Sequence, residues 1–149
     1  MKKLLLIIVA VGVSLMAKAT SFEEFFAAVK EIDGSNYTNV PKFLIPHNDG
    51  NIKQLELLEF EELNDSLINK IIDNRSAITI NKDVTVSQDI EDDEDVRIYM
   101  QTIDEEFHLL IVGIEKENES RWSCLITKML CDKKVLENPN FIKFVKEED

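Results

Sequence analysis

The stretch of this sequence most suited to chemistry is an acidic run, Asp89–Asp95, in which every residue except Ile90 carries a carboxylate. Oxygen-rich loops bind Ca²⁺ in exported proteins. An EF-hand loop needs a glycine at its sixth position and a bidentate glutamate at its twelfth, and counting from Asp89 these positions hold Glu94 and Met100. The EF-hand pattern fails, so we predict a solvated loop that like charges hold open. Weak, unspecific Ca²⁺ association at this loop remains the alternative.

Histidines and cysteines, the other common metal ligands, are scarce. The chain has His47 and His108, Cys124 and Cys131, and no H-E-x-x-H or C-x-x-C motif that would predict zinc. On an extended strand the two cysteines would lie about 23 Å apart, whereas a disulfide needs Cα atoms about 4.4–6.8 Å apart. No glycine or proline lies between them to reverse the chain tightly. We therefore predict two free, buried thiols and no metal site.

Catalytic constellations are also missing from the sequence. No G-x-S-x-G elbow is present, and Cys124 alternates with Trp122 and Ile126, which predicts a buried, inert thiol. The four glycines form no phosphate-binding loop. We predict a non-enzyme, with no catalytic, cofactor-binding or metal-ligating residue and no cofactor. The alternative is a small hydrolase or a ligand- or Ca²⁺-binding protein that uses some of the 29 surface carboxylates.

The first 19 residues have the pattern of a cleavable signal peptide. Lys2 and Lys3 precede the uncharged apolar run Leu4–Met16, and Ala17-Lys18-Ala19 matches the A-x-A cleavage site. The apolar run is shorter than the about 20 residues that a membrane-spanning helix needs. We therefore expect a periplasmic or secreted protein, with no stable membrane insertion after the signal is cleaved.

The acidic balance of the chain excludes several kinds of partner. The full chain has a net charge of −12, and the signal removes three lysines and no acidic residue, so the mature chain is more acidic still. Binding to nucleic acid or to anionic lipid needs a clustered basic surface, so neither is expected. The length of the mature chain fits one domain, residues 20–149.

The elements of this domain follow from hydrophobic periodicity and capping signals. In the first half we predict a helix over 21–31 that opens with a capping box, a strand at 37–40 and a helix at 64–74. Residues 52–60 fit either a helix or a strand, and we favour the strand. In the second half we predict two short strands around a turn at 81–83, the acidic loop, strands at 96–101, 107–114 and 122–129, and a terminal helix from Asn138. The fold class is α+β, with an antiparallel meander sheet and two or three helices packed on it.

Three segments carry a resemblance to a known family. They are SFEEFFAAVKEIDGSNYTNVPK (Ser21–Lys42), EDVRIYMQ (Glu94–Gln101) and FHLLIVGIEKENESRWSCLITKML (Phe107–Leu130). Together they resemble a Bacteroidetes-type family of small exported proteins with a domain of unknown function. The resemblance implies export, a short first helix and a closing hairpin meander. It supplies no catalytic residue, and this chain lacks the leader cysteine of lipoprotein members.

Two features suggest binding to another protein. The predicted terminal helix has an apolar stripe of Phe141, Phe144 and Val145, which either docks on a partner or covers the sheet. Arg97 and Tyr99 are expected on the outer face of their strand, together with Gln101, and are types that interfaces favour. We therefore expect an exported, non-catalytic envelope interaction or regulatory module, with another envelope protein as its partner.

Overall fold

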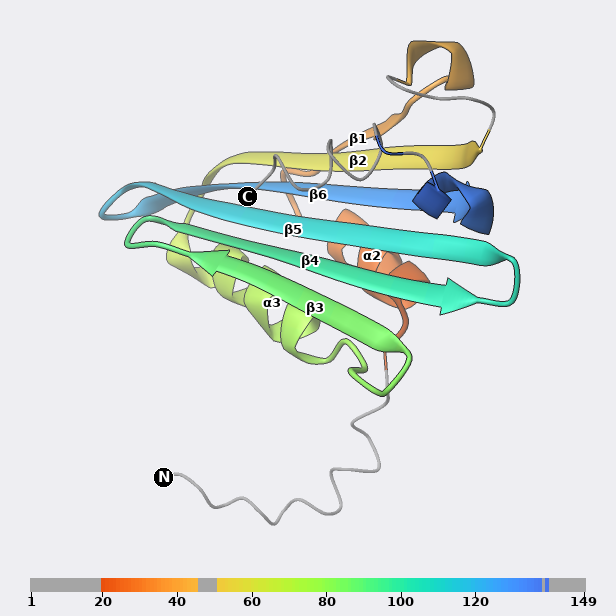
Figure 1. The fold of residues 1–149 in the computed structure, drawn as a ribbon. Coiled ribbons are helices and arrows are strands. Elements are labelled where there is room, and N and C mark those ends of the chain that lie inside the picture. Colours follow the sequence, from red (N-terminus) through yellow and green to blue (C-terminus); the bar gives the residue numbers. More distant parts are fainter. Residues whose placement is uncertain (1–19, 46–50, 138, 140–149) are drawn as a thin grey trace.

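A computed structural model describes residues 20–45, 51–137 and 139. These residues form a six-stranded antiparallel sheet in the order β1-β2-β6-β5-β4-β3, with two helices against one face (Figure 1). The elements in chain order are α2 (Phe22–Lys30), β1 (Asn36–Asn39), η1 (Lys42–Leu44), β2 (Ile52–Leu63), α3 (Asp65–Ser76), β3 (Val84–Ile90), β4 (Glu94–Ile103), β5 (Glu106–Asn118), β6 (Arg121–Asp132) and η2 (Lys133–Glu137). The α+β class and the antiparallel meander are confirmed.

Helix α2 begins as its sequence predicts. The Ser21 hydroxyl accepts a hydrogen bond from the Glu24 amide (3.1 Å), and the Glu24 carboxylate accepts one from the Ser21 amide (3.0 Å), which completes a capping box. The apolar stripe is buried against the sheet and consists of Phe22, Phe25, Phe26 and Val29. Gly34 then turns the chain with a φ of 97°, a left-handed conformation that glycine adopts without strain.

Helix α3 lies beside α2 on the same face of the sheet. The Asn64 side chain caps it by accepting the Leu67 amide (2.9 Å), and Ile68 and Ile71 enter the core. We call this side of the sheet the helix face; its buried strand residues include Leu58, Leu110, Val112, Ile114, Cys124 and Ile126. The helix predicted at 64–74 is confirmed and runs two residues further.

The opposite side, which we call the open face, is buried over only part of its area. At the end near η1 and η2, a second apolar cluster contains Ile45, Ile52, Leu55, Ile98, Phe107, Leu109, Met129, Cys131 and Val135. At the other end Leu125 is 47% exposed. Strand β5, which contains the strand predicted at 107–114, contributes alternate residues to both clusters and is buried on both sides over this stretch.

Two predicted segments have a different structure. Residues 77–80 are not a strand: Ile78 makes only an isolated parallel bridge with Thr20, because its amide still bonds to Arg75 at the end of α3. The predicted acidic loop is a tight hairpin, since β3 continues to Ile90 and β4 begins at Glu94. Asp95 belongs to β4 because Arg97 binds its carboxylate with two hydrogen bonds, of 2.9 and 3.1 Å.

The outer-face position predicted for Tyr99, Arg97 and Gln101 is wrong. Tyr99 is only 4% exposed and lies on the helix face, where its ring packs edge-on against Phe22 with centroids 6.2 Å apart. Strand β4 is covered on both sides, so the alternation of residue types does not identify a solvent face. The predictions for the signal peptide, His47 and the terminal helix lie outside the described residues. Within the described part, no helix has the length and apolar character needed to cross a membrane.

Candidate functional site

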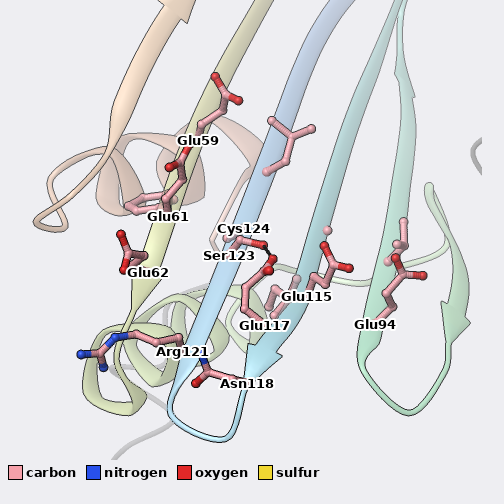
Figure 2. A pocket seen from close by; sticks show the side chains of 15 residues that line it. Glu59, Glu61, Glu62, Glu94, Glu115, Glu117, Asn118, Arg121, Ser123 and Cys124 are labelled. Carbon is pink, nitrogen blue, oxygen red and sulfur yellow. Dashed lines mark hydrogen bonds between the residues drawn. The ribbon is translucent and has the colours of Figure 1, made fainter.

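A hollow lies on the open face, at the end away from η1 and η2. Its volume is about 590 Å³, and strands β2, β6, β5 and β4 form its floor and sides. Figure 2 shows acidic side chains from β2, β5 and β4 around it. Six glutamates contribute to the lining: Glu59, Glu61, Glu62, Glu94, Glu115 and Glu117. We call this feature the acidic trough.

Strand register brings these carboxylates together from distant parts of the chain. Glu115 on β5 lies directly opposite Glu94 on β4 and opposite Ser123 on β6. Glu59 on β2 lies opposite Leu125 on β6. Alternate residues of a strand share a face, so Glu115 and Glu117 point to the same side as Gly113. The trough is therefore a product of the sheet and not of any loop.

A bulge near the end of β2 adds one more carboxylate to the rim. The β2–β6 register shifts between Phe60 and Leu63, and Glu62 has a φ of 52°, in the left-handed region. Such bulges bend a strand and redirect its side chains. Glu61 already shares the face of Glu59 by alternation, and the bulge brings Glu62 to the trough beside it.

The floor of the trough is apolar. Gly113 and Val96 line it next to the exposed Leu125. A Cβ atom added at Gly113 would meet the Leu125 carbonyl oxygen at 3.7 Å and Val96 at 4.0 Å, which are ordinary contacts. The glycine therefore keeps the floor open without being required by the backbone. An apolar strip between rows of carboxylates is the distinctive feature of this surface.

Polar contacts within the trough are few. The Ser123 hydroxyl donates to the Glu117 carboxylate at 2.8 Å. Arg121 is the one basic side chain among the described residues that line the trough, and it donates to the Ser120 carbonyl at 3.1 Å. The lining thus keeps a large excess of negative charge.

The acidic trough offers little for catalysis or metal binding. In the part of the chain that the structure describes, no group of three or more histidine, cysteine or acidic side chains has a geometry that could hold a metal ion. Cys124 lines the trough through β6, but burial raises the pKa of its thiol to about 12, so the thiol stays protonated and inert. His108 lies at the other end of β5, 3.8 Å from Glu106. Neither Cys124 nor His108 therefore supplies the trough with a reactive nucleophile or a base.

A second polar cluster lies on the helix face and joins α2 to the sheet. Lys128 of β6 is buried and contacts the carboxylates of Glu56 (2.6 Å) and Glu23 (2.9 Å). The Tyr37 hydroxyl donates to the other oxygen of Glu56 at 2.6 Å. Burial by itself would raise the pKa of Glu56, but the hydrogen bonds from Lys128 and Tyr37 outweigh it and lower that pKa. Every carboxylate oxygen of Glu56 has a partner, as expected of a structural anchor.

A third cluster ties α3 to β4. Arg75 is buried, and its Nη1 lies 3.3 Å from Asp95, which Arg97 also binds. The Nε atom of Arg75 has no hydrogen-bond partner. The cluster is part of the packing between helix and sheet.

The residues that the sequence analysis singled out lie in different parts of the structure. Of the acidic run, Glu94 reaches the acidic trough, and Glu91, Asp92 and Asp93 lie in the adjacent hairpin turn. Cys124 and Cys131 are free and buried in different apolar clusters, which confirms the prediction of unpaired thiols. The other rim glutamates were missed, although their i, i+2 spacing on β2 and β5 signals one face of a strand.

Comparison of the chain with family models, with curated proteins and with solved structures finds no match.

Proposed function

We propose that this protein is an exported, non-catalytic binding module, and that its acidic trough holds a basic, amphipathic segment of an envelope partner. One observation carries the proposal: six glutamates surround a solvent-exposed apolar strip on a sheet face that the described elements leave uncovered. The resemblance to exported Bacteroidetes-type proteins supports export, but it does not identify what the acidic trough binds.

Charge complementarity favours a basic partner. Like charges directly opposite one another in a sheet, such as Glu94 and Glu115, destabilise it. A lysine or arginine placed between them removes that repulsion and adds attraction. Leu125 then offers apolar area to the same side of that segment, and exposed apolar patches rimmed by polar residues mark interaction sites. Residues two apart share a face in an extended segment, so the predicted partner carries basic and apolar residues in turn at every second position.

A small hydrolase that uses paired carboxylates is the second candidate, because Glu94 and Glu115 lie opposite each other. In such enzymes one carboxyl group needs an environment that keeps it protonated while the other is ionised. The carboxylates of the acidic trough lie on an open, exposed surface, which offers no such contrast. Binding is the function that this geometry supports better.

Calorimetric titration with an extended peptide that has lysine and leucine in turn at every second position, separated by threonine, tests the proposal. We expect saturable binding that weakens with added salt and weakens about tenfold, or about 1.4 kcal/mol, in Glu115→Lys. Asp73→Lys reverses an equal charge on exposed α3 and serves as the matched control, with binding unchanged. An equal loss of affinity for the peptide in both variants would show that binding depends only on net charge, and would contradict a defined binding site. Hydrolysis of a glycan by the wild type, lost in Glu94→Gln, would favour the second candidate.

The location is tested separately. We expect mass spectrometry of the protein from its producing cells to give a mature N-terminus at Thr20. A chain that retains Met1 would contradict export and leave the binding proposal standing.

A further inference from the structure

The two edges of the sheet are very different. Strand β1 is short, and Pro41 follows it closely. Strand β3, at the other edge, has an unbroken register with β4 from Val84↔Gln101 to Ile90↔Asp95. It contains no proline, lysine or bulge, which are the usual means of protecting an edge. Its outer side has no strand partner in the described part of the chain.

The hydrogen bonds of the β3–β4 turn establish which groups face outward. Glu91 and Glu94 exchange both backbone hydrogen bonds, at 2.8 and 3.3 Å, so they form a hydrogen-bonded pair. Such pairs alternate along an antiparallel ladder, so the N–H and C=O groups of every second residue point away from β4. Those residues are Val84, Val86, Gln88 and Ile90. The Val84 amide is satisfied by the Asn81 carbonyl at 3.1 Å, and the other groups face the open edge.

The edge is complementary to itself. If a second β3 runs antiparallel with Ser87 on the two-fold axis, Val84 lies opposite Ile90 of the other copy and Val86 lies opposite Gln88. All outward-facing residues then fall in hydrogen-bonded pairs, giving about six inter-chain hydrogen bonds. No strand residue faces a like charge, because Asp89 meets Thr85. Ile90, which is 56% exposed, gains an apolar neighbour.

We propose that this edge pairs with a second copy of the same chain, through β3 centred on Ser87, to form a continuous sheet across the dimer. The backbone ladder alone would accept any extended strand; a second copy is favoured because this register places Ile90 opposite Val84 and sets no like charge opposite Asp89. The pairing is independent of the acidic trough, which lies on the open face of the sheet. A seven-residue ladder is small for a stable interface, and each chain has a net charge of −12, so we expect a weak dimer that higher salt strengthens.

Cysteine cross-linking tests the register directly. On the two-fold axis Ser87 forms a non-hydrogen-bonded pair with its own copy, with Cα atoms about 4.5 Å apart, which is within the range of a disulfide. We expect Ser87→Cys to form a covalent dimer under mild oxidation. Thr85→Cys is the matched control: its Cα would lie about 14 Å from its copy, too far to bridge. A mixture of Thr85→Cys and Asp89→Cys should cross-link to each other. The native thiols are buried and do not interfere.

The association itself is measured by sedimentation equilibrium over a range of concentrations. Gln88→Pro removes an outward-facing donor and leaves the ladder to β4 intact, so we expect the dissociation constant to rise at least tenfold with an unchanged far-UV circular dichroism spectrum. Gln88→Thr keeps that donor and should dimerise like the wild type. Cross-linking of Ser87→Cys no faster than Thr85→Cys, or a wild type that stays monomeric at millimolar concentration and high salt, overturns the proposal.

Discussion

Lys128 shows what a buried charge requires in this molecule. It is held between Glu56 and Glu23, and its Nζ lies 5.2 Å from the centre of the Phe26 ring. Burial alone would lower the pKa of Lys128, but the hydrogen bonds to the two glutamates outweigh it, so the pKa is raised and the side chain stays charged. Lys128 is therefore stable in its charged form, and its positive charge in turn stabilises the carboxylates of Glu56 and Glu23.

We expect Lys128→Met to lower the free energy of unfolding by about 3 kcal/mol, measured by urea denaturation, because Glu56 would be left buried without its cation. The double variant Lys128→Met/Glu56→Met removes both charges, and we expect it to recover most of that loss. If the double variant is as unstable as the sum of the two single variants, the ion pair is not what Lys128 contributes.

At the scale of elements, Tyr37 joins three of them. Its hydroxyl binds Glu56 of β2, its ring packs against Phe26 of α2 with centroids 6.2 Å apart, and the Nζ of Lys30 lies 3.6 Å from the ring centre. The hydrogen bond to Glu56, followed by burial, raises the pKa of Tyr37 to about 12. Short β1 is held to the sheet by its pairing with β2, to which this side chain adds.

The raised pKa predicts a loss of stability in alkali. The neutral phenol is favoured in the folded state, so its contribution is complete below pH 10, the ordinary tyrosine pKa, and declines as the pH rises toward about 12. We expect thermal melts to fall across this range less steeply in Tyr37→Phe than in the wild type. Tyr37→Phe lacks the ionisable hydroxyl but keeps the ring, so an unchanged slope would contradict the assignment.

The elements that the sequence predicted well are those with local signals. The capping box at Ser21 and the Asn64 cap establish both helix starts without reference to the rest of the chain. Segment 77–80 was mistaken for a strand because Ile78 and Ile80 alternate, whereas its structure depends on the distant Thr20. The face of Tyr99 was wrong because β4 is buried on both sides.

The acidic trough could not be predicted for a related reason. Its glutamates come from β2, β4 and β5, and only the strand order, with β6 inserted between β2 and β5, makes them neighbours. Nothing in the local sequence around Glu59 indicates that Leu125 lies opposite it. The run Asp89–Asp95 is easy to recognise in the sequence because its acidic residues are nearly consecutive. The carboxylates of the acidic trough come together only through the register of the strands.

Considered as a whole, the molecule carries a large negative charge, and six of its carboxylates lie together in the acidic trough. Self-repulsion of this kind destabilises a compact state and is screened by salt. We expect the melting temperature to rise between about 10 and 200 mM NaCl, because the Debye length falls from about 30 to about 8 Å near these limits.

Glu115→Gln removes the like-charge repulsion between Glu115 and Glu94, so we expect this variant to melt higher than the wild type at low salt and to respond less to added salt. Asp73→Asn, on exposed α3, is the matched control. Equal stabilisation by both substitutions would show that the repulsion is spread over the whole surface.

The strand order also has a consequence for how the chain is made. A ribosome releases β2 early, but its long-range neighbour β6 emerges only after α3 and the β3–β5 meander. Until then β2, with Leu58 on the helix face and Leu55 on the open face, has only the short β1 to pair with. Pairings between such distant segments slow folding and expose aggregation-prone intermediates. Completion of the described sheet thus waits for β6, which joins β1 and β2 to the other three strands.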